Sequence, residues 1–383
     1  MTLLFWILVG LIVYATIGYP LLALALAQLR PPRPVLEPTD PLAVDFVIPA
    51  HNESDVIAEK IRNTLVQSAS VSHAIRILVV SDGSGDGTVD LARAEGGDAV
   101  EVIDIQPRQG KVNALNRAID RLAGDIVVFS DANAMLVDGA LGALLQHYGD
   151  PDVGGVCGAI RIEKAAKAGI ASSEGLYWRY DQAVKAAESR LGGAVSAQGS
   201  FHSVRRAHVR PLPLDAADDF TLSVRAVSGG GRLVFEPAAI AVETVTEKAQ
   251  KEITRRIRST ERGWRALMTH SHLLNPVRSG LYAVQLFSHK VLRRLVPFLM
   301  VALFVVNLAL LGQGAFYQIT FALQTLLYAA GLIGLLVPAA RVLPGIRHAF
   351  FGLMALGAMA LGLINYYRGK RSTIWAPVRD GAG

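Results

Sequence analysis

The chain opens with an almost unbroken run of apolar residues over 3–28. This run exceeds the roughly 20 residues that a helix needs to cross a bilayer. The sequence Ala-Leu-Ala at 23–25 resembles a signal-peptidase site, but the stretch before it carries no Lys or Arg, which argues against a cleaved signal peptide. Arg30 and Arg33 follow the run directly and place the next segment in the cytoplasm. We therefore predict a transmembrane helix over 1–29.

Further apolar stretches follow near the C-terminus, at 295–311, 316–337 and 348–364. They predict a transmembrane region of three segments over 295–366, and thus four spans in total. The preceding segment, 273–295, mixes apolar and basic residues, which predicts an amphipathic helix on the cytoplasmic interface. For the tail, 367–383, two indications conflict. An even number of spans places it outside, whereas its basic residues argue for the inside.

Residues 42–266 have the ordinary polarity of a globular domain and enough length for one α/β core. Short β-rich runs at 44–50, 75–81 and 126–130 each end at a polar or Gly-rich turn, and amphipathic helices follow the first two. Repeated strand, turn and helix units predict a Rossmann-like sheet with a ligand at the carboxyl ends of its strands. The turn at 82–88 lacks both the P-loop spacing and GxGxxG, so neither ATP hydrolysis nor a dinucleotide cofactor is indicated.

The amino-acid composition limits the kinds of metal site and of binding partner that the chain can have. Cys157 is the single cysteine, which excludes an internal disulfide and a Cys-based zinc site. Any metal must therefore bind carboxylate, amide or imidazole groups. The net charge is +6, but the basic residues cluster beside apolar runs, which favours membrane lipids as a partner. The sequence carries no motif that reads DNA or RNA, so a nucleic-acid partner is not expected.

One candidate metal site follows the third strand, at Asp131-Ala132-Asn133. Side chains two residues apart on a strand point the same way, so Asp131 and Asn133 can address one hard cation. Mg²⁺ or Mn²⁺ suits their carboxylate and amide oxygens. The alternative is that Asp131 only caps the turn.

Ordered motifs then carry a family resemblance. They are PAHNE at 49–53, SDGSGDGT at 81–88, GKVNALN at 110–116, SDAN at 130–133 and the acidic pair at 218–219. In order and spacing they resemble the family-2 glycosyltransferases with a GT-A nucleotide-sugar domain, over about 44–258. The flanking apolar segments are similar to those of the membrane-integrated members, which include the cellulose, chitin-oligosaccharide, poly-N-acetylglucosamine and hyaluronan synthases.

The resemblance implies a donor site for a UDP-sugar. Glu53 and Asp82 would hold the uridine and ribose, with Pro49 in the same segment as Glu53. Lys111 would lie on the diphosphate side, although a solvated lysine at a helix start is the alternative. Asp131 and Asn133 would form the metal motif, Asn133 replacing its usual second Asp. Ser81 stands where the family often has another Asp.

The resemblance also implies the catalytic base. Asp219 aligns with the last carboxylate of the family's catalytic-acid segment and would take the proton of the acceptor hydroxyl. Its neighbour Asp218 would raise the proton affinity of Asp219 if both face the cleft. The alternative is that the adjacent acids simply cap the following helix.

Acceptor-facing elements are implied by Trp178, Gln198 and Gly199, although Trp178 at helical spacing is as often core. His202 has no partner visible in the sequence, which favours a structural histidine. The polymer-forming members carry a Gln-x-x-Arg-Trp motif, and the corresponding stretch here keeps only its tryptophan, Trp264, with Arg262 one position early. Arg258, just upstream, could close over the diphosphate or face anionic lipid.

The expected function is that of an inverting, metal-dependent glycosyltransferase. It takes a nucleotide-sugar, UDP-linked by the resemblance, and transfers the sugar to a saccharide or lipid-linked acceptor. The expected location is the inner (cytoplasmic) membrane, as a multi-pass protein with a cytoplasmic catalytic domain and room for an export or polymerisation partner. Two alternatives stay open: transfer to polyprenyl phosphate, and a catalytically silent membrane scaffold.

Overall fold

The computed structural model describes residues 1–163, 170–244 and 249–370. Contacts along the chain divide it into two compact units. The first, helical unit contains Met1–Leu22, Lys248–Trp264 and Ala283–Arg371. The second unit contains the sheet, within Ala23–Glu247, together with Arg265–Tyr282. Each unit is described by itself.

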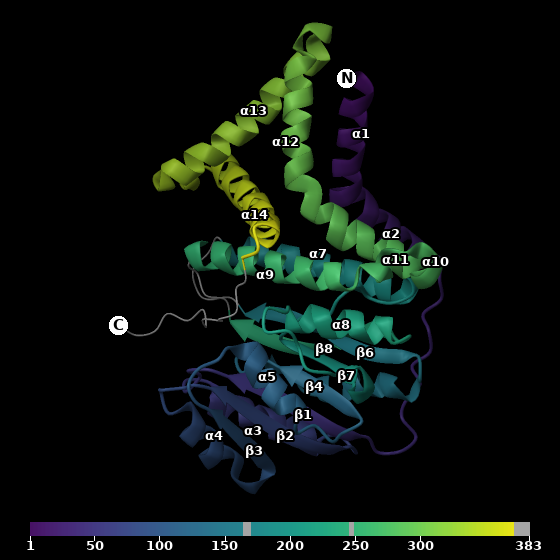
Figure 1. Cartoon of the computed structure of the whole chain (residues 1–383), viewed down its shortest axis with the longest axis vertical. Helices are drawn as coiled ribbons and strands as arrows, with labels where there is room; N and C mark the ends of the chain where they lie inside the picture. Colours follow the sequence, from purple (N-terminus) through teal and green to yellow (C-terminus); the bar gives the residue numbers. More distant parts are fainter. Residues whose placement is uncertain (164–169, 245–248, 371–383) are drawn as a thin grey trace. The chain divides into compact units, whose positions relative to one another are not determined.

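The second unit is built on an eight-stranded sheet in the order β3-β2-β1-β4-β7-β6-β8-β5 (Figure 1). The strands are β1 (Ala43–Ala50), β2 (Ala74–Asp82), β3 (Val100–Ile105), β4 (Ile126–Ser130), β5 (Met135–Leu136), β6 (Val153–Glu163), β7 (Phe201–Arg205) and β8 (Arg232–Thr244). Strands β3, β2, β1 and β4 are parallel neighbours, whereas β7 runs antiparallel to both β4 and β6. The three strands predicted from the sequence are confirmed, and the sheet as a whole is mixed.

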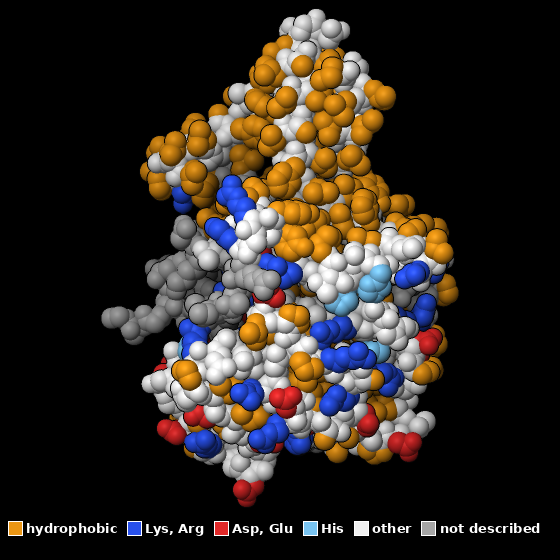
Figure 2. Space-filling view, in the orientation of Figure 1, with side chains coloured by type: hydrophobic (Ala, Val, Ile, Leu, Met, Phe, Trp, Pro, Cys, Tyr) orange, Lys and Arg blue, Asp and Glu red, His pale blue; other side chains and the backbone are white. Residues whose placement is uncertain are grey.

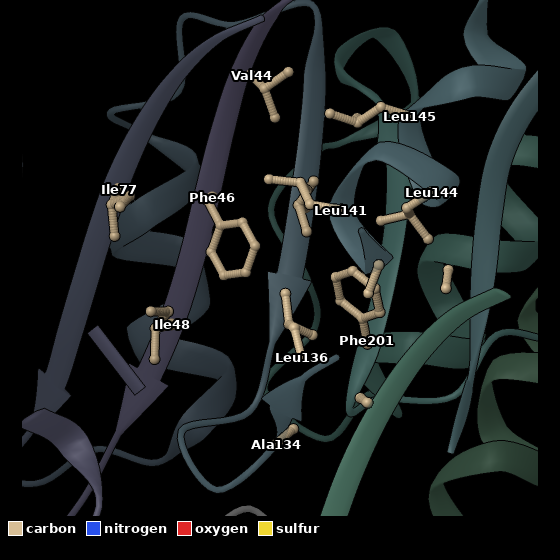
Figure 3. Close-up of a cluster of buried hydrophobic side chains, with 14 of the residues drawn as sticks. Val44, Phe46, Ile48, Ile77, Ala134, Leu136, Leu141, Leu144, Leu145 and Phe201 are labelled. Atoms are coloured by element: carbon tan, nitrogen blue, oxygen red, sulfur yellow. The ribbon is translucent and has the colours of Figure 1, made fainter. Parts of the chain in front are cut away.

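Helices flank the strands of this unit. They are α3 (Ile57–Ala69), α4 (Thr88–Gly96), α5 (Lys111–Ile119), α6 (Ala140–Leu145), α7 (Ile170–Leu191) and α8 (Asp218–Ser228). Side chains alternate along β1, so that Phe46 packs into one buried cluster and Val47 into another. The Phe46 cluster includes Ile61 of α3, Ala92 of α4 and Leu141 of α6. Figure 3 shows Leu141 near Phe46. The Val47 cluster instead contains Leu115 of α5 and Leu222 of α8. Two buried faces explain why these strands are apolar throughout.

The strand register sets the position of the site. Ala50, at the end of β1, pairs with Ser81 of β2, and Val47 pairs with Phe129 of β4. Because the three strands are parallel, the loops that follow them leave the sheet at one edge. That edge is where the sequence predicts a ligand.

The first unit contains long apolar helices. Its elements are α1 (Thr2–Val13), the start of α2 (Tyr19–Gln28), α12 (Arg293–Ala309), α13 (Ala315–Leu336) and α14 (Pro344–Tyr367), with α9 (Ala249–Thr269) up to Trp264. Four helices of the described chain are long and apolar enough to cross a membrane, which matches the predicted number. Hydrophobic side chains cover the visible surface of α12 and α13, while charged side chains gather over the sheet (Figure 2). Membrane crossing itself stays a prediction.

The segment 273–295 differs from the separate interfacial helix that the sequence predicts. After α10 (Pro276–Ser279), a continuous helix starts at Leu281, passes through α11 (Leu281–Leu286) and a π-helical stretch at Phe287–Leu292, and runs on into α12. The basic residues at 289–294 interrupt the apolar pattern but not the helix. The helix that contains the predicted span 295–311 thus begins at Leu281, and the interfacial position of the segment before residue 295 stays a prediction.

The helices of the first unit have defined relative directions. Phe5 of α1 packs with Val306 of α12, and Ala15 packs with Val296, so the two helices are antiparallel. Residue 1 thus lies at the end of α12 opposite to Arg293. The end of α14 returns to the beginning of α12, because Arg368 and Leu295 line one pocket.

This arrangement predicts the side on which the chain ends. Most of the predicted tail, from 371 on, lies outside the described residues. We expect green fluorescent protein fused after Gly383 to fluoresce in bacterial cells, and alkaline phosphatase at the same position to be inactive, because the end of α14 shares a side with the basic start of α12. Phosphatase fused after Gly314, at the other end of α12, is the opposite control. Active phosphatase at Gly383 would show that α14 completes a fourth crossing.

Candidate functional site

A pocket lies at the sheet edge formed by the carboxyl ends of β1, β2 and β4. Among the residues that line it are six predicted from the sequence: Pro49, Glu53, Asp82, Lys111, Asp131 and Asn133. They come from the end of β1 with its following loop, the end of β2, the start of α5 and the turn after β4. The parallel register of the strands brings these segments together. The arrangement is that of a nucleotide-binding edge in an α/β sheet.

The Gly-rich turn at 83–88 braces the loop that carries Glu53. Gly85 donates its N–H to the side chain of Asn52 at 2.9 Å, and Thr88 Oγ1 accepts the N–H of Glu53 at 2.8 Å. Asn52 itself has a positive φ of 52°, a conformation that asparagine tolerates better than most residues. Glu53 is consequently held, 5% exposed, against the pocket. The polar groups of this Gly-rich turn therefore position the loop that carries Glu53.

Asp82 fixes the approach to α5. Its Oδ1 and Oδ2 accept the backbone N–H groups of Gln109 and Gly110, each at 2.7 Å. Gly83 has a φ of +66°, and a Cβ at this position would lie 2.6 Å from the backbone of Arg108, so only glycine fits. A contact between Asp82 and a donor stays a prediction. These hydrogen bonds show that Asp82 holds the backbone of residues 109–110, directly before Lys111.

Lys111 lies between two carboxylates. Its Nζ is 2.7 Å from Asp131 Oδ1 and 3.1 Å from Asp218 Oδ2. Burial lowers the pKa of this ammonium, but the carboxylates of Asp131 and Asp218 outweigh that effect and raise the pKa above its ordinary value. Lys111 is therefore a charged, paired group of the site and not a solvated lysine.

Asp131 and Asn133 occupy the tight turn that follows β4. Asp131 donates its N–H to Ser200 O at 3.2 Å, and its own carbonyl accepts the N–H of Ala134 at 3.1 Å. Both side chains line the pocket, and their oxygens are of the kind that Mg²⁺ and Mn²⁺ bind. Within the described residues, no group of three or more His, Cys, Asp or Glu side chains is arranged to hold a metal. A cation at this turn would need further oxygens, such as those of a diphosphate.

Asp218 and Asp219 begin α8 and have different surroundings. Burial raises the pKa of Asp218, but the adjacent Lys111 ammonium outweighs it and the pKa is lowered. Burial together with the charge of Asp218 raises the pKa of Asp219 to about 6. A Cβ on Gly199 would lie 3.7 Å from Asp219 Oδ2, so this predicted acceptor residue lies directly beside the predicted base.

The other predicted acceptor residues do not line this pocket. Gln198 donates from Nε2 to Asp181 Oδ2 of α7 at 3.2 Å, and Trp178 lies on α7 with a partly exposed side chain. His202 is buried and stacks on Phe129, with ring centroids 5.3 Å apart. Burial lowers the pKa of His202 to about 4, so this ring is neutral at pH 7 and structural in character.

Three predicted residues belong to the first unit. Arg258, Arg262 and Trp264 lie on α9, where Arg262 and Trp264 are buried and Arg258 is partly exposed. Their predicted contacts with the donor or with lipid stay predictions.

Comparison with known proteins connects this geometry to a family. The model of the family described as "Glycosyl transferase family 2" matches residues 45–211, which include all the residues that line the pocket. Residues 45–211 form a family-2 glycosyltransferase domain.

Relatives extend the match beyond this family-2 domain. An N-acetylglucosaminyltransferase of Rhizobium sp. (strain N33) is 24% identical over 56% of this chain and 51% of its own length. A poly-beta-1,6-N-acetyl-D-glucosamine synthase of Staphylococcus aureus is 26% identical over 59% of this chain and 55% of its own. The chain thus spans about half the length of these curated relatives.

The fold extends over nearly the whole chain in one solved structure. A mannosyltransferase from Pyrobaculum calidifontis, in complex with GDP-Man and Mn²⁺, has a TM-score of 0.71 over 96% of this chain and 100% of its own, at 22% identity. The predicted GT-A fold class with flanking apolar helices is confirmed.

Sequence reasoning missed one residue of the family-2 domain, Lys60. It lies on α3 and is 0% exposed, although lysine is almost never fully buried without a partner. A signal was present, because Ile57, Lys60, Ile61 and Thr64 follow the i, i+3, i+4, i+7 spacing of a buried helix face. A lysine inside that pattern marks a polar group directed into the core.

Proposed function

We propose that the chain is an inverting, metal-dependent glycosyltransferase that transfers a sugar from a nucleotide-sugar to a saccharide or lipid-linked acceptor at a membrane. The observation that carries the proposal is the position of the Lys111 ammonium between Asp131 and Asp218. This contact joins the donor pocket to the acidic pair that begins α8. Donor binding, charge neutralisation and proton removal thereby meet within one cluster.

The mechanism assigns each residue one task. Asp219 accepts the proton of the acceptor hydroxyl as its oxygen attacks the anomeric carbon, on the side opposite to the diphosphate. The carbon–oxygen bond to the diphosphate breaks, and the nucleoside diphosphate leaves with added negative charge. Lys111 lines the same pocket, and its proposed task is to neutralise part of that charge. When bound by Asp131 and Asn133, Mg²⁺ or Mn²⁺ would supply further positive charge for the departing group.

The proposed donor is UDP-linked, from the motif resemblance at Glu53 and Asp82. The mannosyltransferase of similar fold was solved with GDP-Man and Mn²⁺, which supports a nucleotide-sugar with a divalent cation and makes a GDP-sugar the competing donor. The names of the two relatives support an N-acetylglucosaminyl group. The catalytic unit is proposed to face the cytoplasm, on the inner membrane.

The acidic pair gives this mechanism a pH dependence. Asp219 must be ionised to accept a proton, and its pKa is raised to about 6. We expect kcat/KM to be constant near neutral pH and to fall about tenfold for each unit of pH below roughly 6, because kcat/KM reports groups of the free enzyme. A profile from pH 5 to 8 measures this.

The Asp218→Asn variant is the control for the profile. It removes the neighbouring charge that raises the pKa of Asp219, so the falling limb should move to lower pH. A wild-type profile that stays flat down to pH 5 would contradict the assignment of Asp219.

Nucleoside diphosphate release by the detergent-purified chain tests the function. UDP- and GDP-linked sugars are offered with Mg²⁺ or Mn²⁺, and with oligosaccharides, a membrane lipid extract or polyprenyl phosphate as acceptors. Metal-dependent turnover of one donor supports the proposal, and its acceptor separates saccharide from lipid transfer. Binding of neither nucleotide, with or without metal, would favour a silent scaffold instead.

A further inference from the structure

The buried Lys60 connects α3 to the turn that presents the proposed metal ligands. Its Nζ donates to Ser130 Oγ at 2.7 Å and to Ala134 O at 2.5 Å. Ser130 directly precedes Asp131, and Ala134 directly follows Asn133. One amino group thus binds both ends of the turn.

Lys60 is the first member of a polar row along α3. Asn63 exchanges two hydrogen bonds with the backbone of Leu136, both at 2.8 Å. Gln67 donates to Val137 O at 2.9 Å. Residues 60, 63 and 67 share one helix face, so α3 holds the chain from 130 to 137 at successive points. Only Lys60 contacts the part that contains Asp131 and Asn133.

The amino group of Lys60 is enclosed by protein. Lys60 is fully buried and lies 5.6 Å from the centroid of the Phe46 ring. A buried amino group is costly unless it is hydrogen-bonded, so the fold that buries Lys60 also favours the position of its two acceptors. Ser130 Oγ in turn donates to Ser200 O at 3.0 Å, which ties the turn to the acceptor segment beside Gly199.

We propose that Lys60 is a positioning residue that holds the turn 130–134 in the conformation in which Asp131 and Asn133 bind the divalent cation with the donor. Lys60 does not touch substrate or metal, and it acts through the two acceptors that flank the ligand pair. The inference rests on the proposed function, since it assumes a cation at this turn. Residues that orient metal ligands commonly set metal affinity.

The test compares Lys60→Met with Gln67→Met. Methionine is an unbranched apolar side chain of the length of glutamine and one atom shorter than lysine, and it removes the hydrogen bonds of either residue. Residue 67 holds the chain beyond the turn. Electron paramagnetic resonance measures Mn²⁺ affinity in the presence of UDP or GDP, and thermal unfolding measures stability. We expect Lys60→Met to weaken Mn²⁺ binding about tenfold or more, as for other groups that orient metal ligands. Gln67→Met should leave Mn²⁺ affinity near that of the wild type even where it lowers Tm.

Equal Mn²⁺ affinity in wild type and folded Lys60→Met would overturn the proposal, as would an equal loss in both variants. If Lys60→Met does not fold, Ser130→Ala decides, because it removes one of the two acceptors and should weaken Mn²⁺ binding in the same direction. A wild-type chain that binds no Mn²⁺ with either nucleotide would overturn the metal dependence of the proposed function itself. The two failures are therefore distinguishable.

Discussion

Replacing Asp219 with asparagine is expected to lower kcat by about 1,000-fold, within the range that a positioned general base contributes. Asparagine keeps the size and the hydrogen-bond acceptor of the side chain, but its amide cannot take the proton of an acceptor hydroxyl. Asp219 lies beside Gly199 and does not line the donor pocket, so nucleotide binding should survive. Initial-rate kinetics and calorimetric titration with UDP or GDP measure the two quantities separately.

Asp215→Asn is the matched control for this variant. It makes the same chemical change four residues earlier, at a carboxylate that pairs with Arg265 at 3.3 Å. Its kcat should stay close to that of the wild type. If Asp219→Asn retains most of its activity, or loses nucleotide binding together with activity, the assignment of Asp219 as the base is wrong.

Lys111→Met is expected to lower kcat/KM for the donor about 100-fold, which corresponds to roughly 3 kcal/mol and lies near the low end of the cost of breaking a buried ion pair. The variant leaves the carboxylates of Asp131 and Asp218 without the ammonium between them. Negative charge then remains where the donor diphosphate must bind. The loss should therefore appear mainly as a raised KM for the donor.

The same variant should bind Mn²⁺ more tightly in the absence of nucleotide, because Nζ of Lys111 no longer competes for Asp131 Oδ1. Opposite changes in nucleotide and metal affinity distinguish this role from a general loss of structure. Arg117→Met, an exposed cation on the same helix, is the control and should change neither affinity. An unchanged donor KM would contradict the placement of Lys111 at the diphosphate.

Several elements were readable from local pattern. The strands β1, β2 and β4 are largely apolar because both faces of this part of the sheet are buried, and such runs are recognisable in any sequence. The acidic and Gly-rich turns that follow these strands are equally recognisable from the sequence. Periodicity predicts such features because they depend on neighbours within a few residues of one another.

Other features depend on contacts between distant parts of the chain. The antiparallel position of β7 between β4 and β6 left no local signature. The ion pair of Lys111 with Asp218 joins residues that are 107 positions apart. In the helical unit, the sequence gives two conflicting indications for the side of the chain end, and neither could show that the end of α14 lies beside Leu295.

The sequence by itself determined the α/β domain between apolar ends, the family-2 motifs and the identity of the acidic and basic residues, because composition, periodicity and spacing are properties of the chain alone. Only the tertiary structure decided that Lys111 is shared between Asp131 and Asp218, that Asp219 has a pKa of about 6, and that Lys60 supports the turn 130–134. Charge, burial and hydrogen bonding act through space. They are fixed only when the sheet brings its loops to one edge.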